Sequence, residues 1–122
     1  MSDPYHDYWV VFVPYCSSDL WSGTNQASPS TAGYHFLGAE IVAAVLQDLI
    51  LHHNLLAASK VVLSGCSAGA AGVALNCDRV KDKLPDADFR CVAGNSKNLV
   101  LMLKLSLHIL PEEGIGLHMV FS

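Results

Sequence analysis

Residues 60–75 read KVVLSGCSAGAAGVAL, and they carry the strongest indication of the fold in this chain. The apolar run at residues 60–64 predicts a strand, and the alanine-rich residues that follow predict a helix over 68–83. Between them lies a G-x-S-x-G motif, in which Gly65 and Gly69 stand two residues before and after Ser67. A strand, this motif and a helix together form the context of a nucleophile elbow, because the two glycines let strand and helix approach closely.

The elbow predicts roles for two residues. Ser67 would stand exposed on a strained turn at the carboxyl end of its strand, where its hydroxyl can act as a nucleophile. The backbone N–H of Ala68 would point into an oxyanion hole. The motif therefore favours ester hydrolysis by a serine nucleophile. Bare G-x-S-x-G segments also occur by chance, and the alternative is a Gly- and Ser-rich turn that opens an ordinary helix.

Strands and helices alternate on both sides of this motif. Residues 8–13 form an uninterrupted apolar run that ends at Pro14, which is typical of a strand buried on both faces. Apolar residues repeat every fourth position in 36–53, as in an amphipathic helix, and residues 88–93 predict a third strand. We therefore predict an α/β fold with a parallel sheet and helices on both of its faces.

The long loop at residues 15–33 is rich in Ser, Thr, Asn, Pro and Gly. In a parallel sheet this loop and Ser67 lie at the same edge, at the carboxyl ends of the strands, where such folds place their sites. Asp19 and Trp21 are therefore candidates for the mouth of a pocket beside Ser67. Equally, Trp21 can cover the edge of the sheet while Asp19 caps a turn, and the sequence does not choose between these roles.

The regular alternation ends at Gly94. Residues 103–109 alternate between apolar and polar as a strand would, and a helix over 98–110 is equally possible. We expect residues 1–93 to form a partial domain and residues 94–122 to form a divergent C-terminal tail.

The composition argues against several classes of function. The 122 residues suffice for one small domain. Of these residues, 52% are hydrophobic and 15% are charged, which suggests that something else covers part of the surface of the domain. A net charge of −4 without a basic cluster argues against nucleic-acid binding. No apolar stretch reaches the roughly 20 residues of a membrane span. The polar start of the chain does not resemble a signal peptide.

The four cysteines are Cys16, Cys66, Cys77 and Cys91, and they contain no C-x-x-C pair. A zinc site is therefore not expected, and the sequence as a whole implies no metal or organic cofactor. Cys66 lies inside the elbow motif and reads as a small buried hydrophobe. Cys77 and Cys91 can form a disulfide if the helix after the elbow packs beside the next strand, and the sequence leaves this pairing open.

Three segments together resemble the pectin acetylesterase and Notum family of carboxylic ester hydrolases. They are VPYCSSDLWSG at 13–23, LSGCSAG at 63–69 and LNCDRV at 75–80, and the resemblance covers about residues 8–93. It implies an α/β-hydrolase-like fold, with Ser67 as the nucleophile and Ala68 as an oxyanion donor. It also implies an acylated polysaccharide or a lipidated protein as the substrate, and a secreted or extracellular protein.

The departures from the family pattern suggest that the chain is a fragment. The resemblance implies a Gly-Gly-Trp-type segment before the first strand and a triad aspartate and histidine after the third, and none of these is matched here. His108 and His118 follow Ser67, as do Asp86, Asp88, Glu112 and Glu113, but none stands in a triad-like context. We expect the triad Asp and His to lie outside this chain, which would then be inactive by itself. The alternatives are a non-catalytic α/β module and an unstable truncated product.

Overall fold

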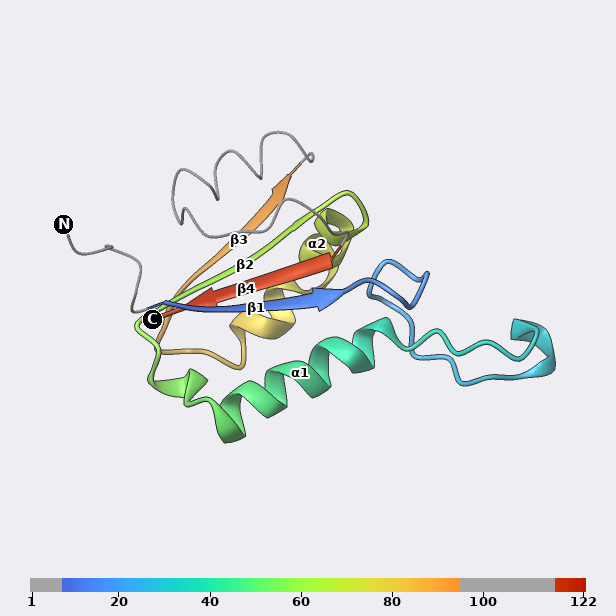
Figure 1. Ribbon diagram of the computed structural model, residues 1–122, viewed down its shortest axis with the longest axis horizontal. Helices are drawn as coiled ribbons and strands as arrows, with labels where there is room; N and C mark the ends of the chain where they lie inside the picture. The colour runs from blue at the N-terminus through green and yellow to red at the C-terminus, as the bar shows by residue number, and fades with distance from the viewer. Residues whose placement is uncertain (1–7, 95–115) are drawn as a thin grey trace.

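The computed structural model describes residues 8–94 and 116–122, which form a mixed four-stranded sheet with two α-helices (Figure 1). The elements in chain order are β1 (Trp9–Pro14), the short 3-10 helix η1 (Pro29–Thr31), α1 (Gly38–His52), a second 3-10 helix η2 (Leu55–Ala57), β2 (Lys60–Cys66), α2 (Ala68–Lys81), β3 (Asp88–Gly94) and β4 (Gly116–Phe121).

The strand order in the sheet is β1-β4-β2-β3. β2 and β3 are adjacent and parallel, with α2 as their crossover, as predicted. β4 pairs antiparallel with both β1 and β2, so β1 and β2 run parallel to each other and are separated by β4. Figure 1 shows β4, in red, pointing opposite to β1 and β3. The prediction of a wholly parallel sheet is therefore wrong, because a strand from residues 94–122 enters between the predicted strands.

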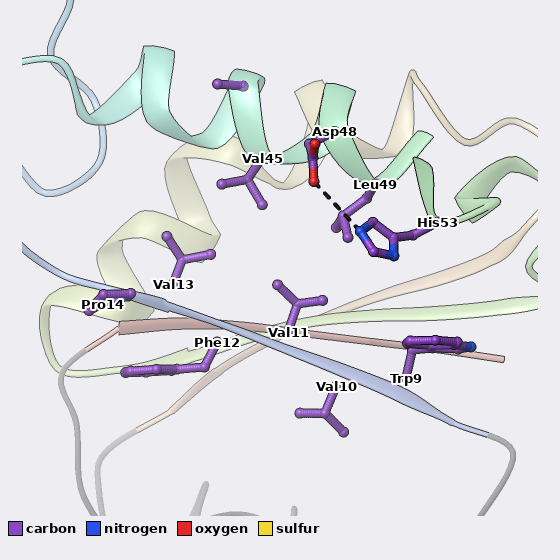
Figure 2. Close-up of a pocket in the computed structure, with 11 residues that line it drawn as sticks. Trp9, Val10, Val11, Phe12, Val13, Pro14, Val45, Asp48, Leu49 and His53 are labelled. Atoms are coloured by element: carbon purple, nitrogen blue, oxygen red, sulfur yellow. Dashed lines mark ion pairs between the residues drawn. The ribbon is translucent and has the colours of Figure 1, made fainter. Parts of the chain in front are cut away.

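Both described α-helices pack on the same face of the sheet. Leu63 of β2 lies against Val42 of α1, and the next residue on that face, Gly65, lies against Gly69 of α2. Figure 2 shows the alternation on β1, where Val11 and Val13 point toward α1 while Val10 and Phe12 point away. The prediction of helices on both faces is not met by the described elements.

The boundaries of α1 follow from local chemistry. The helix begins at Gly38, two residues later than predicted, and the N–H of Gly38 donates to the Asp19 carboxylate at 2.7 Å. This carboxylate satisfies one of the N–H groups that a helix leaves without a partner in its first turn. The helix ends at His52, and Asn54 takes a left-handed conformation with φ of 56°, as asparagine often does after a helix.

A disulfide joins α2 to β3. Cys77 and Cys91 are bonded, with a Cα–Cα distance of 6.2 Å, so the pairing that the sequence left open is present. Cys16 and Cys66 are free thiols; Cys16 is exposed and Cys66 half-buried.

Candidate active site

Ser67 occupies the turn between β2 and α2 with φ of 55° and ψ of −121°. An L-residue with a side chain avoids this region, because its Cβ crowds the backbone. The conformation persists only where the surrounding structure holds it in place, and such strain gathers at functional sites. The side chain of Ser67 is exposed at the end of its strand. The strained, exposed turn that the motif predicts is therefore present.

Close backbone packing explains the two glycines of the motif. A Cβ on Gly65 would overlap the backbone carbonyl of Gly69, and a Cβ on Gly69 would overlap the carbonyl of Gly116 at the start of β4. The backbones of β2 and α2 are thus in direct contact at Gly65 and Gly69, and the backbone of β4 contacts Gly69 as well. Any side chain at these positions would push the turn out of place.

Ala68 is the first residue of α2. The first N–H groups of a helix have no partner within it, and the partial positive charge of the helix dipole gathers there. The N–H groups of Ala70 and Ala71 already donate to the carbonyl of Ser67, at 3.0 and 3.4 Å. The oxyanion-binding role of the Ala68 N–H stays a prediction.

Among the described residues, no hydrogen bond joins the Ser67 side chain to a histidine or a carboxylate, and the absence of the triad Asp and His from this chain stays a prediction. Ser67 makes no side-chain hydrogen bond as the cap of α2. His118 lies opposite Ser64 in the β4–β2 register, three residues before Ser67, which is about 10 Å along a strand. Asp88 pairs with Lys60 at the opposite end of β2. His108, Glu112 and Glu113 lie outside the described residues.

The Asp19 carboxylate organises the loop that follows β1. It accepts hydrogen bonds from the backbone N–H groups of Trp21 and Gly23, both at 3.0 Å, and of Gly38 at 2.7 Å. The hydroxyl of Ser17 donates to it as well. Burial by itself raises the pKa of Asp19, but these hydrogen bonds outweigh it and lower the pKa below its ordinary value of 3.8.

Trp21 fixes this loop to α2. Its side chain is fully buried and lies against Gly72, where a Cβ would overlap the indole ring. The carbonyl of Trp21 accepts a hydrogen bond from the buried amide of Asn76 at 3.0 Å. The loop after β1 and α2 are therefore neighbours, and the predicted closeness of the loop to Ser67 itself stays a prediction. These contacts support the structural alternative for Asp19 and Trp21, and a pocket role for either residue stays a prediction.

Asn76 was missed by the sequence reasoning. Its amide donates to the carbonyls of both Trp21 and Gly72, and its side-chain oxygen accepts from Arg79 at 3.4 Å. The available signal was a polar residue on the apolar face of a predicted helix, since such a residue must find partners when it is buried.

A hollow of about 680 Å³ lies between β1 and α1, lined among others by Val11, Val13, Val45 and Leu49 (Figure 2). Asp48 and His53 at its rim form a contact of 3.8 Å, drawn as the dashed line. β1 is an outer strand two positions away from β2, so this hollow is separate from Ser67.

A sequence profile of the pectinacetylesterase family matches residues 2–96. The chain belongs to this family. It is 44% identical over 80 residues to the palmitoleoyl-protein carboxylesterase NOTUM of Schmidtea mediterranea, which covers 66% of this chain and 15% of the relative. It is 46% identical over 81 residues to the Homo sapiens protein of that name, covering 63% and 16%.

The pectinacetylesterase-family chain thus spans about 15% of the length of these curated relatives. No solved structure gives a significant match. None of the described helices is long and apolar enough to cross a membrane. Among the described residues, no group of three or more His, Cys, Asp or Glu side chains is placed to hold a metal ion.

Proposed function

We propose that this chain is the nucleophile-bearing part of a serine carboxylic ester hydrolase with an α/β-hydrolase-like fold, and that Ser67 is the nucleophile. The observation that carries the proposal is the strained, exposed conformation of Ser67 between β2 and α2. Membership of the pectinacetylesterase family supports the reaction class, since the family and the matched relatives are named for ester hydrolysis.

The reaction would proceed through an acyl-serine. The Ser67 hydroxyl oxygen attacks the carbonyl carbon of the ester, and the N–H of Ala68 donates to the oxygen that becomes negatively charged. The bond to the alcohol then breaks, and the serine proton passes through a base to the departing oxygen. Water hydrolyses the acyl-serine and releases the carboxylic acid.

The chain by itself would be a poor catalyst. A serine hydroxyl is a weak nucleophile at neutral pH unless a base accepts its proton, and no histidine or carboxylate among the described residues is hydrogen-bonded to Ser67. We propose that the triad aspartate and histidine lie outside this chain.

The substrate class is an acylated polysaccharide or a lipidated protein. The family profile is named for pectin acetyl esters, whereas the matched relatives are named as palmitoleoyl-protein carboxylesterases. The identity of 41–48% to these relatives favours a lipid-modified protein. We place the protein outside the cell, because the Cys77–Cys91 disulfide is typical of an oxidising compartment.

A chimaera tests the nucleophile. Residues 8–94 would replace the matching segment of the Homo sapiens relative, which supplies the rest of an esterase. We expect hydrolysis of a chromogenic ester and labelling by a fluorophosphonate probe, and both should fall at least about 10³-fold in Ser67→Ala. The matched control is Ser30→Ala, at an exposed serine outside the elbow. Equal rates in Ser67→Ala and the unaltered chimaera would contradict the proposal and favour a non-catalytic module.

The isolated chain tests the second part of the proposal. We expect no Ser67-dependent labelling by the same probe. Rapid labelling that disappears in Ser67→Ala would show that a base lies within the chain.

A further inference from the structure

A second hollow lies between α1 and α2. It has a volume of about 550 Å³ and is lined from residues 42–51 on one side and residues 76–83 on the other. This volume is within the range of about 300–1,000 Å³ that is typical of sites for small molecules. Arg79, one of the lining residues, follows Ser67 by 12 positions, which is about 18 Å along a helix. The hollow is therefore separate from the candidate active site.

The two walls of this hollow differ in chemistry. Apart from Gln47, the α1 wall is apolar and consists of Val42, Ala43, Leu46, Ile50 and Leu51. Leu51 is 65% exposed, so part of this apolar wall is in contact with water. The opposite wall carries the cations Arg79 and Lys83. The hollow thus offers an apolar surface to one side of a ligand and positive charge to the other.

The cations of the second wall are available to a ligand. The side-chain oxygen of Asn76, a residue only 1% exposed, accepts a hydrogen bond from Arg79 at 3.4 Å. This bond uses one of the five N–H donors of the guanidinium. Within residues 8–94 and 116–122, neither Arg79 nor Lys83 forms an ion pair. The exposed carboxylate of Asp82 lies on the same wall, but the two cations outnumber it.

The walls favour a hydrocarbon chain over a peptide. The backbone groups of α1 and α2 already bond within their helices, so an extended peptide would find no partners for its own N–H and C=O groups. Two turns of a bound helix, roughly 10 Å wide and 11 Å long, would fill about 850 Å³, more than the 550 Å³ of the hollow. An alkyl chain has no polar groups to satisfy and gains free energy by leaving water. A carboxylate at its end would complement the cationic wall.

We propose that the hollow between α1 and α2 binds a free long-chain fatty acid. Its hydrocarbon chain lies along the apolar wall of α1, and its carboxylate binds Arg79 and Lys83. The inference does not depend on the role proposed for Ser67, because no step of it involves ester hydrolysis.

Binding of cis-parinaric acid, a fluorescent fatty acid, to the full chain tests the proposal. Its fluorescence should rise to saturation, and palmitate should displace it. Laurate, which has a shorter chain, should displace it at least about tenfold more weakly, because it buries less apolar surface. Absence of saturable binding would overturn the proposal.

Charge variants of the second wall test the position of the carboxylate. Palmitate should bind about fivefold more weakly to the double variant Arg79→Gln and Lys83→Gln. It should bind more tightly to Asp82→Asn, which removes the opposing charge. The matched control is Lys81→Gln, an exposed cation of α2 outside the hollow, which should leave the affinity unchanged. Equal affinities in the double variant and the control would overturn the proposal.

A variant of the first wall tests the position of the hydrocarbon chain. Leu51→Glu places a negative charge in the hollow and should weaken palmitate binding at least about tenfold. The control is Leu75→Glu, at a leucine that is also exposed but lies outside the hollow, and it should have no effect. Tm values check that both variants are folded, and Leu51→Gln replaces Leu51→Glu under the same criteria if the latter is not. Equal weakening in the variant and its control would also overturn the proposal.

Discussion

Ser67 and Asp19 show two ways in which single residues support the candidate site. Ser67 is kept in a conformation that costs free energy, with φ of 55°. Burial removes water from the Asp19 carboxylate, but hydrogen bonds from three backbone N–H groups and from the hydroxyl of Ser17 take the place of the lost water. The strain at Ser67 opposes folding, whereas the hydrogen bonds at Asp19 favour it. Substitutions at the two positions should therefore change stability in opposite directions.

The strain at Ser67 predicts that Ser67→Gly stabilises the chain. Glycine tolerates this backbone conformation, so relief of strain worth about 1–3 kcal/mol should exceed the entropic cost of glycine, about 0.5–1 kcal/mol. The free energy of unfolding in urea should rise by about 1 kcal/mol. Ser67→Ala retains the strain and serves as the control. A Ser67→Gly protein less stable than Ser67→Ala would contradict a strained turn.

The hydrogen bonds to Asp19 predict that Asp19→Asn destabilises the chain by about 2 kcal/mol, because it removes charge-assisted bonds and turns one acceptor into a donor. Asp48→Asn, on the exposed side of α1, should change stability by less than about 0.5 kcal/mol. Urea unfolding followed by tryptophan fluorescence measures both effects.

The same carboxylate should make the chain acid-sensitive. The pKa of Asp19 is lowered in the folded state. The contribution of Asp19 to folding stability is therefore complete above pH 3.8 and is lost as the pH falls through the folded-state pKa. Asp19→Asn should remove this part of the acid dependence.

Among the secondary-structure elements, α2 connects the turn at Ser67, β3 and the loop after β1. It begins at the strained serine, holds the loop after β1 through Asn76 and Gly72, and is bonded to β3 through Cys77. These contacts come from three separate segments of the chain. The direction of α2, and with it the position of Ala68, is therefore determined by long-range contacts.

Removal of the disulfide tests this arrangement. Cys77 and Cys91 close a loop with a sequence separation of 14, for which chain entropy predicts a loss of about 3 kcal/mol when both become serine. Guanidinium unfolding of the double variant measures the loss. Cys16→Ser, at an exposed free thiol, is the control and should have little effect. A double variant as stable as the unaltered chain would show that packing alone holds α2 on β3.

At the scale of the whole molecule, one late strand completes the sheet. His118 in the middle of β4 lies between Phe12 and Ser64, neither of which is charged, and its ring is 4.8 Å from the ring of Phe12. The Nδ1 atom of His118 and the hydroxyl of Ser64 are both buried without a hydrogen-bond partner among the described residues. Burial lowers the pKa of His118 below its ordinary value of 6.5.

This placement predicts that the chain loses stability in mildly acidic solution. The unfolded chain takes up a proton at His118 near pH 6.5 while the folded chain resists it, so the contribution of His118 to stability is constant above that pH and falls below it. The slope should approach about 1.4 kcal/mol per pH unit until the folded-state pKa is reached. His118→Leu should make the Tm, measured by thermal unfolding, nearly independent of pH between pH 5 and pH 7. An equal slope in both proteins would exclude His118 as the cause.

Local sequence signals determined most of the individual elements. β1, β2, β3, α1 and α2 all form within a few residues of the predicted bounds, because apolar runs, a fourfold helical repeat and turn residues act over short distances. The G-x-S-x-G motif predicted the turn at Ser67 for the same reason, since its glycines permit a local backbone approach. The resemblance to carboxylic ester hydrolases also rested on short contiguous segments, and the family match agrees with it.

The way in which these elements combine depends on contacts between residues that are distant in the sequence. β4 pairs with residues about 50 to 110 positions earlier in the chain, and its short apolar sequence does not specify a partner, a direction or a place in the sheet. Asp19 and Trp21 likewise received their roles from Gly38, Gly72 and Asn76, which no local pattern connects to them. Strand pairing and buried polar contacts depend on which distant backbone lies within hydrogen-bond reach, so the folded chain settles them.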